Sequence, residues 1–165
     1  MAAKTYNVLF ICTGNSARSI LAEALMSQLG ASRGFKAYSA GSHPKGQVHP
    51  WALKTLALHH IPADGFRSKS WDEFALEGAP RMDFVFTVCD QAAGEVCPYW
   101  PGQPVTAHWG LPDPAAVEGS EEEKAKAFLD ALVTIKRRVE LMLALPLQSL
   151  DRMAIQKKVG DIGTR

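Results

Sequence analysis

The sequence predicts an α/β fold: a single-domain open parallel sheet of about four strands, flanked by helices on both faces. Short apolar runs alternate along the chain with stretches of helical periodicity, and short loops join them. The 165 residues, 47% of them hydrophobic and 21% charged, fit one domain with its own core. We assign this domain to residues 1–146 and a C-terminal helical tail to residues 147–165.

The first strand is expected over Tyr6–Ile11. Val8 to Ile11 form a continuous apolar run, as in a strand of a parallel sheet that is covered on both faces. From Ser19 to Leu29 the apolar residues recur with helical spacing, and this pattern closes at Gly30. A strand therefore leads through a loop that begins at Cys12 into a helix.

The middle of the chain repeats this order. The apolar and turn patterns predict strands at Phe35–Ala40, Asp83–Val88 and Val105–Trp109, and a helix from about Pro50 to His59. Ligands of such sheets bind beyond the carboxyl ends of the strands. Cys12, Cys89 and Asp113 each follow a predicted strand end, so we expect them on one rim of the sheet.

The last predicted helix of the domain begins after Ser120. Ser120 and Glu123 have the spacing of a capping box, and Pro146 ends the helix. The apolar stripe of this helix consists of Phe128, Leu132, Ile135, Val139 and Met142. The tail is expected to form a further short helix, with Leu150, Met153 and Ile155 as its apolar contacts.

Composition narrows the function. The 18 basic and 17 acidic residues nearly cancel, which argues against a nucleic acid or a membrane surface as partner. No leader peptide or long apolar span is evident, so we expect a cytoplasmic protein. There the three cysteines would be reactive, metal-binding or simply buried rather than a disulfide framework. No zinc spacing or dinucleotide fingerprint is present, and we expect neither a metal nor a bound cofactor.

The loop from Cys12 to Ser19 has the features of an oxyanion site with a nucleophilic thiol. A helix N-terminus and a nearby cation lower the pKa of a cysteine, and Arg18 offers a planar fork for two oxygens. Gly14 would allow close approach of the backbone or a positive φ, Asn15 would hold the loop shape, and Ser19 would donate to the Cys12 sulfur. The expected oxyanion-binding residues are Thr13, Gly14, Asn15, Ser16, Ala17, Arg18 and Ser19. A cysteine followed after five residues by an arginine is a loose pattern by itself; a buried cysteine and a solvated arginine would also produce it.

With its setting between strand and helix, this loop resembles that of the low-molecular-weight protein tyrosine phosphatase fold family. The resemblance extends from Tyr6 to Leu145 and includes Ser39-Ala40-Gly41 and Asp113-Pro114. It implies that Cys12 is the nucleophile, Arg18 and the loop amides the oxyanion clamp, Ser19 the thiolate stabiliser and Asp113 the proton donor. Without the resemblance, Pro112-Asp113-Pro114 would be read as an ordinary turn.

The loop suits phosphate and arsenate equally, so the choice of reaction depends on Cys89 and Cys97. This region resembles the thioredoxin-coupled arsenate reductases of the same fold family, which use three cysteines as a relay. The resemblance implies attack of Cys12 on arsenate, then a Cys12–Cys89 disulfide with release of arsenite, then a Cys89–Cys97 disulfide. Thioredoxin, or glutaredoxin or glutathione, would reduce the last disulfide, and the role would be arsenic detoxification.

Two further readings remain open. A phosphatase would hydrolyse phosphotyrosine or small phosphoesters through a thiophosphate at Cys12, with Cys89 as a packed apolar residue and Cys97 as a loop residue. A non-catalytic module would bind oxyanions or sense redox state. Two features depart from the reductase pattern: the seven-residue gap between Cys89 and Cys97, and Ala17 where many relatives carry another cysteine.

Overall fold

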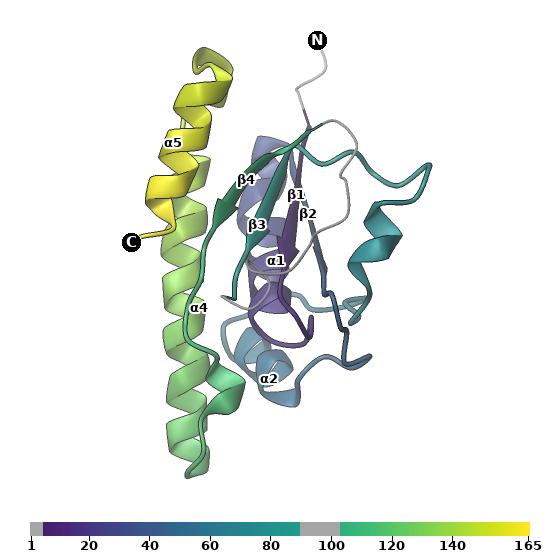
Figure 1. The fold of residues 1–165 in the computed structure, drawn as a ribbon. Helices are drawn as coiled ribbons and strands as arrows, with labels where there is room; N and C mark the ends of the chain where they lie inside the picture. The colour runs from purple at the N-terminus through teal and green to yellow at the C-terminus, as the bar shows by residue number, and fades with distance from the viewer. Residues whose placement is uncertain (1–4, 90–102) are drawn as a thin grey trace.

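The computed structural model describes residues 5–89 and 103–165. Four parallel strands form one sheet in the order β2-β1-β3-β4 (Figure 1). Their bounds are Tyr6–Ile11 for β1, Phe35–Ala40 for β2, Phe84–Thr87 for β3 and Val105–His108 for β4. The predicted α/β fold with a four-stranded parallel sheet is confirmed.

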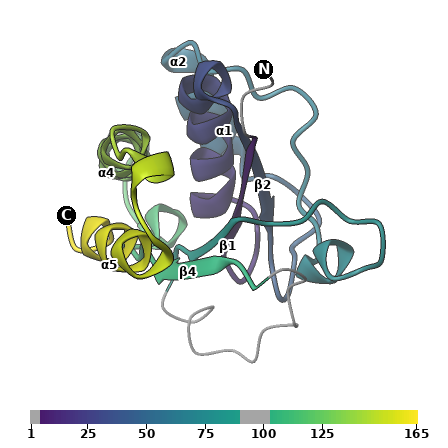
Figure 2. The same cartoon turned by 90° about the horizontal axis from the view of Figure 1, so that it is seen from above.

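The helices are α1 (Arg18–Gly30), α2 (Pro50–Leu58), α4 (Glu121–Leu143) and α5 (Arg152–Ile162). Short 3-10 turns are η1 (Ala31–Arg33), η2 (Trp71–Phe74), η3 (Pro114–Ala116) and η4 (Leu147–Ser149). Seen from above, α1, α2 and α4 lie on one side of the sheet and α5 runs beside β4 (Figure 2). On the other face, Phe74 of η2 meets the ring of Tyr38 edge-on at 5.6 Å.

The core forms because both faces of the central strands are covered. Val8, Leu9, Phe10 and Ile11 of β1 are fully buried, as their continuous apolar run predicts. On one face, Phe10 is the register neighbour of Phe86, and Trp109 stacks on Phe86 with ring centroids 4.2 Å apart. Stacking after the end of β4 thus fixes the chain where it leaves the sheet.

The strand order determines where the loops meet. The chain goes from β1 to β2 on one side and returns to β3 on the other side of β1, so the order reverses between β1 and β3. Ile11 is in register with Thr87, and the loops that follow these two strands leave the same rim side by side. Such a switch point is where open α/β sheets bind their ligands.

Helix ends follow the local sequence closely. The amide of Glu123 donates to the Ser120 side chain at 3.2 Å, which confirms the predicted start of α4.

In α5, Val159 and Ile162 are buried, whereas Met153 is 83% exposed. The expectation that Met153 packs in the tail was wrong, because the buried face follows Ile155, Val159 and Ile162 at helical spacing and Met153 lies off that face.

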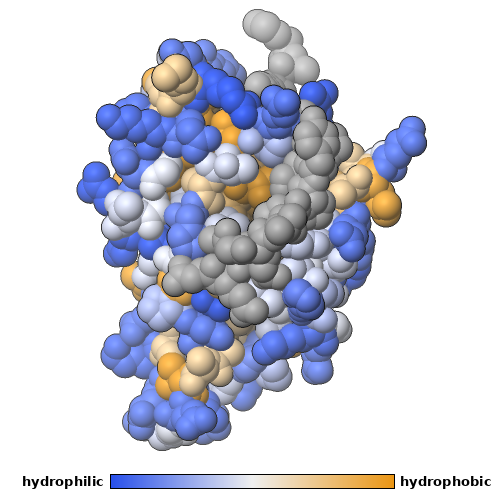
Figure 3. Space-filling model, in the orientation of Figure 1, coloured by the Kyte–Doolittle hydropathy of each residue, from blue (hydrophilic) through white to orange (hydrophobic). Residues whose placement is uncertain are grey.

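The face of the molecule seen in Figure 3 is largely hydrophilic, with apolar side chains in small separate groups. Within residues 5–89 and 103–165, none of the helices combines the length and the apolar character needed to cross a membrane.

Candidate active site

The loop between β1 and α1 is shaped by a second segment that runs along it. The amides of His43, Lys45 and His49 donate to the carbonyls of Thr13, Gly14 and Ser16, each at 2.9 Å. These contacts take up the carbonyl side of the loop. The amide side of the same peptides is then directed to the opposite side, as in the concave backbone sites that bind anions.

Asn15 holds the turn of the loop. Its φ of 44° is left-handed, a conformation that asparagine tolerates better than most residues. Its side-chain amide donates to the hydroxyls of Ser19 at 2.8 Å and Ser39 at 2.9 Å, and its carbonyl oxygen accepts from the amide of Lys69 at 2.8 Å. Asn15 is fully buried, so nothing competes with these bonds.

The structure differs from the expectation for Gly14, and a second glycine, Gly41, lies against the loop. Gly14 does not have a positive φ, and the atoms nearest to a Cβ placed on it belong to the side chain of Lys45, the closest at 3.2 Å. At Gly41 a Cβ would lie 2.5 Å from the carbonyl oxygen of Thr13 and 2.7 Å from that of Cys12. The close backbone approach predicted for Gly14 is therefore required at Gly41, because β2 ends directly against the loop.

The start of α1 suits an anion. Its N-cap, Ala17, makes no side-chain cap, and no acidic residue lies in the first turn. The first amides of a helix carry partial positive charge, and here no capping side chain accepts a hydrogen bond from them. A cavity of about 700 Å³ opens over this end, lined by Cys12 to Arg18 together with His43, Lys45, Cys89, Gly110, Leu111, Pro112, Asp113 and Ala115.

Arg18 connects the loop to the segment after β4. Its guanidinium donates to the carbonyl of Leu111 at 2.8 Å and lies 3.7 Å from the carboxylate of Asp113. The other Asp113 oxygen accepts from the amide of Ala115 at 2.9 Å, which caps η3. Arg18 is the more buried partner, with 13% of its side chain exposed against 41% for Asp113. Asp113 thus lines the cavity beside Arg18.

Cys12 and Cys89 are buried thiols in hydrogen-bond contact. The Cys89 sulfur also accepts from the amide of Thr13 at 3.3 Å. The Cys89 thiol and burial raise the pKa of Cys12, and Arg18 and the amide of Gly14 lower it by less. The pKa of Cys12 is therefore raised in this arrangement, contrary to the expectation of a lowered one. The reason is that Cys89 stands beside the sulfur.

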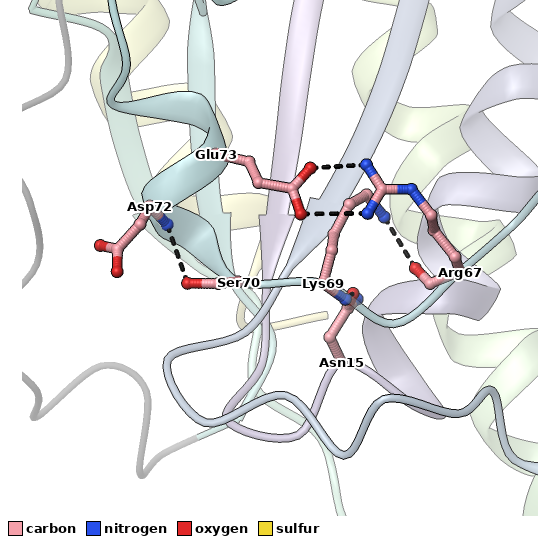
Figure 4. Close-up of polar contacts among 6 residues, drawn as sticks. All are labelled: Asn15, Arg67, Lys69, Ser70, Asp72 and Glu73. Atoms are coloured by element: carbon pink, nitrogen blue, oxygen red, sulfur yellow. Dashed lines mark hydrogen bonds and ion pairs between the residues drawn. The ribbon is translucent and has the colours of Figure 1, made fainter.

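A buried polar cluster of Ser39, Glu23 and Lys69 contacts the loop through Asn15. Ser39 donates to the carboxyl of Glu23 on α1 at 2.5 Å, and burial raises the pKa of Glu23. Lys69 is buried too, and its ammonium donates to the carbonyl of Arg67 at 2.8 Å. Figure 4 shows Lys69 between Asn15 and the exposed ion pair of Arg67 with Glu73. Burial lowers the pKa of Lys69, and the nearby Glu23 counters that effect.

The structure brings together Cys12, Arg18, Cys89 and Asp113 from three separate parts of the chain. Cys97 lies outside the described residues. The donation from Ser19 to Cys12 stays a prediction; the Ser19 hydroxyl accepts from Asn15. No local pattern in the sequence points to Lys45, Glu23 or Lys69, because their neighbours come from distant segments.

Comparisons with known proteins agree with this geometry. Residues 7–157 match the family described as low molecular weight phosphotyrosine protein phosphatase. An arsenate reductase of Halalkalibacterium halodurans is 36% identical over 133 residues, 81% of this chain and 91% of that protein. One of Bacillus subtilis is 38% identical over 121 residues, 73% and 83% of the two chains. The solved thioredoxin-dependent arsenate reductase of Corynebacterium glutamicum is 27% identical with a TM-score of 0.57, over 86% of this chain and 65% of that one. The chain therefore belongs to the low molecular weight phosphotyrosine protein phosphatase family, in which its relatives include these arsenate reductases.

Proposed function

We propose that this protein is an arsenate reductase that works by a cysteine relay and serves arsenic detoxification in the cytoplasm. The observation that carries the proposal is the contact between the thiols of Cys12 and Cys89 at the oxyanion loop. Hydrolysis of a phosphoester needs one thiolate and a water. Reduction of arsenic needs two electrons, which two neighbouring thiols supply together when they are oxidised to a disulfide.

The steps follow from the positions of the groups. The Cys12 thiolate attacks arsenate held by the loop amides and Arg18, and Asp113 protonates the oxygen that leaves as water. The Cys89 thiolate then attacks the Cys12 sulfur. The electron pair of the sulfur–arsenic bond passes to arsenic, arsenite leaves, and a Cys12–Cys89 disulfide remains. Before Cys12 attacks arsenate, Cys89 must move away from it, because the Cys89 thiol keeps the pKa of Cys12 raised.

Regeneration requires an external reductant. In the proposal, the Cys97 thiolate attacks the Cys89 sulfur, releases Cys12 as a thiolate and forms a Cys89–Cys97 disulfide. A dithiol protein of the thioredoxin kind then reduces that disulfide. A related structure is that of a thioredoxin-dependent arsenate reductase, which supports this choice of donor over glutaredoxin or glutathione.

A staged cysteine series tests the relay. Arsenite is measured in a single turnover and in multiple turnovers with thioredoxin, thioredoxin reductase and NADPH. We expect no arsenite from Cys12→Ser or Cys89→Ser. Cys97→Ser should release one arsenite per chain and stop at a Cys12–Cys89 disulfide visible by mass spectrometry. Multiple turnover by Cys89→Ser would contradict the relay. Fast phosphoester hydrolysis that needs Cys12 and ignores Cys89 and Cys97, with no arsenite formed, would favour a phosphatase instead.

A further inference from the structure

Arg138, in the C-terminal half of α4, is a buried cation bound to main-chain oxygens. It is 6% exposed. Its guanidinium donates to the carbonyl of Trp109 at 2.7 Å and to that of Gly110 at 3.1 Å, and its Nε donates to the main-chain oxygen of Arg165 at 3.2 Å. A charged group is costly to bury unless hydrogen bonds compensate it, and here three main-chain oxygens accept three hydrogen bonds from the guanidinium.

Two of the carbonyls that Arg138 binds, those of Trp109 and Gly110, belong to the first residues of the segment that ends at Asp113. The next carbonyl, that of Leu111, accepts from Arg18. Arginines from two helices therefore hold three consecutive carbonyls of this segment. Only Leu111 and Pro112 separate Gly110 from Asp113, so a shift at Gly110 is passed on to the carboxylate.

The C-terminal end of α5 contacts the start of this segment, next to Trp109, from another side. A Cβ on Gly163 would lie 2.2 Å from the carbonyl oxygen of His108 and 2.9 Å from the Trp109 ring. The Trp109 indole donates to the carbonyl of Val159 at 2.9 Å. The helix therefore sits directly against the end of β4, where the Asp113 segment begins.

We propose that Arg138 is a positioning residue, and that together with the C-terminal end of α5 it holds Trp109 and Gly110 so that Asp113 stays beside Arg18 in the cavity that Cys12 also lines. This inference rests on the proposed function in one respect, the use of Asp113 as proton donor. It gives the C-terminal helix a part in the reaction without any contact with the oxyanion.

Two matched pairs of variants test the inference. Arg138→Lys replaces the planar guanidinium with an ammonium group, and Arg152→Lys is the control for this change. Arg152 also donates to main-chain carbonyls, those of Gln103 and Pro104, but at the other end of β4. Gly163→Ala pushes α5 away from His108. Its control is Gly160→Ala in the same helix, where a Cβ would meet nothing within 4 Å.

The first readout is hydrogen exchange at the amide of Ala115, which donates to Asp113. We expect exchange to rise about tenfold in Arg138→Lys and Gly163→Ala and to stay unchanged in the two controls. The second readout is steady-state arsenate reduction, where kcat should fall about tenfold with KM changed less than about twofold. In an Asp113→Asn background, Arg138→Lys should cause no further loss of kcat, because the two changes act through one group.

The outcomes separate this inference from the proposed function. A wild-type chain that forms no arsenite contradicts the proposed function, and the exchange of Ala115 still decides the positioning role. Exchange that is unchanged in both test variants overturns the inference. A loss of kcat that keeps its full size in the Asp113→Asn background also overturns it. If Arg138→Lys fails to fold, Gly163→Ala against Gly160→Ala provides the same comparison.

Discussion

Cys12 is subject to opposing electrostatic effects that set its protonation. The Cys89 thiol and burial disfavour the thiolate, whereas Arg18 and the amide of Gly14 favour it. The Cys89 thiol has the largest effect, so in this arrangement the attacking sulfur is a thiol. Thiolate chemistry at Cys12 is thus linked to the position of Cys89.

This balance predicts the reactivity of a variant. Cys89→Ala removes the largest cause of the raised pKa and admits water, so the pKa of Cys12 should fall. Alkylation of Cys12 by iodoacetamide at neutral pH should then be faster than in the wild type, and its pH profile should shift to lower pH. Rates are measured by mass spectrometry of the Cys12 peptide. Arg18→Gln should shift the profile the other way; a Cys89→Ala profile equal to that of the wild type would mean that Cys89 does not control Cys12.

At the level of the elements, the loop depends on how closely β2 approaches it. Gly41 follows β2, donates its amide to the carbonyl of Lys69 and lies against the carbonyls of Cys12 and Thr13. Asn15 fixes the same turn through Ser39 of β2. The loop conformation is therefore held by a neighbouring strand end as well as by its own residues.

A pair of glycine variants tests this dependence. Gly41→Ala would force a methyl group against backbone oxygens that cannot move without breaking the Asn15 bonds. We expect it to lower the free energy of unfolding by about 2–3 kcal/mol. The atoms nearest to the new methyl group of Gly14→Ala belong to the flexible Lys45 side chain. It should cost less than about 1 kcal/mol. Urea unfolding compares the two, and a larger loss for Gly14→Ala would show that the backbone approach at Gly41 is unimportant.

For the whole molecule, the buried carboxyl of Glu23 makes stability depend on pH. Burial raises its pKa, and the bond from Ser39 and the charges of Lys69 and Arg67 counter this by less. A carboxyl with a raised folded pKa favours the fold when it is protonated. Its contribution is complete below the unfolded pKa and is lost as the pH rises through the folded pKa.

Glu23→Gln should therefore remove part of the pH dependence. The free energy of unfolding of the variant, relative to the wild type, should increase between about pH 4 and pH 8, since glutamine does not ionise. Urea unfolding across this range measures it. Glu73→Gln is the control: Arg67 lowers the pKa of Glu73, so its contribution is lost as the pH falls, and it should be small because the pair is exposed. A flat difference for Glu23→Gln would contradict the assignment.

Much of the fold was predictable because the signals are local. The apolar run of β1, the bounds of β2 and the cap at Ser120 were placed correctly, since periodicity and capping act over a few residues. Strand ends moved by a residue at β3 and β4, where fraying makes the boundary soft. The tail helix was expected, but its buried face was misjudged at Met153.

The sequence by itself determined the strand–loop–helix around Cys12, with Arg18 at the end of the loop, where the helix begins, because these residues are neighbours along the chain. Only the tertiary structure decided what surrounds them. Cys89 reaches Cys12 because the sheet order reverses between β1 and β3. Asp113 reaches Arg18 because its segment follows β4 and its first carbonyls are held by Arg138. Strand order and buried polar contacts join residues from distant parts of the chain, and no local pattern encodes them.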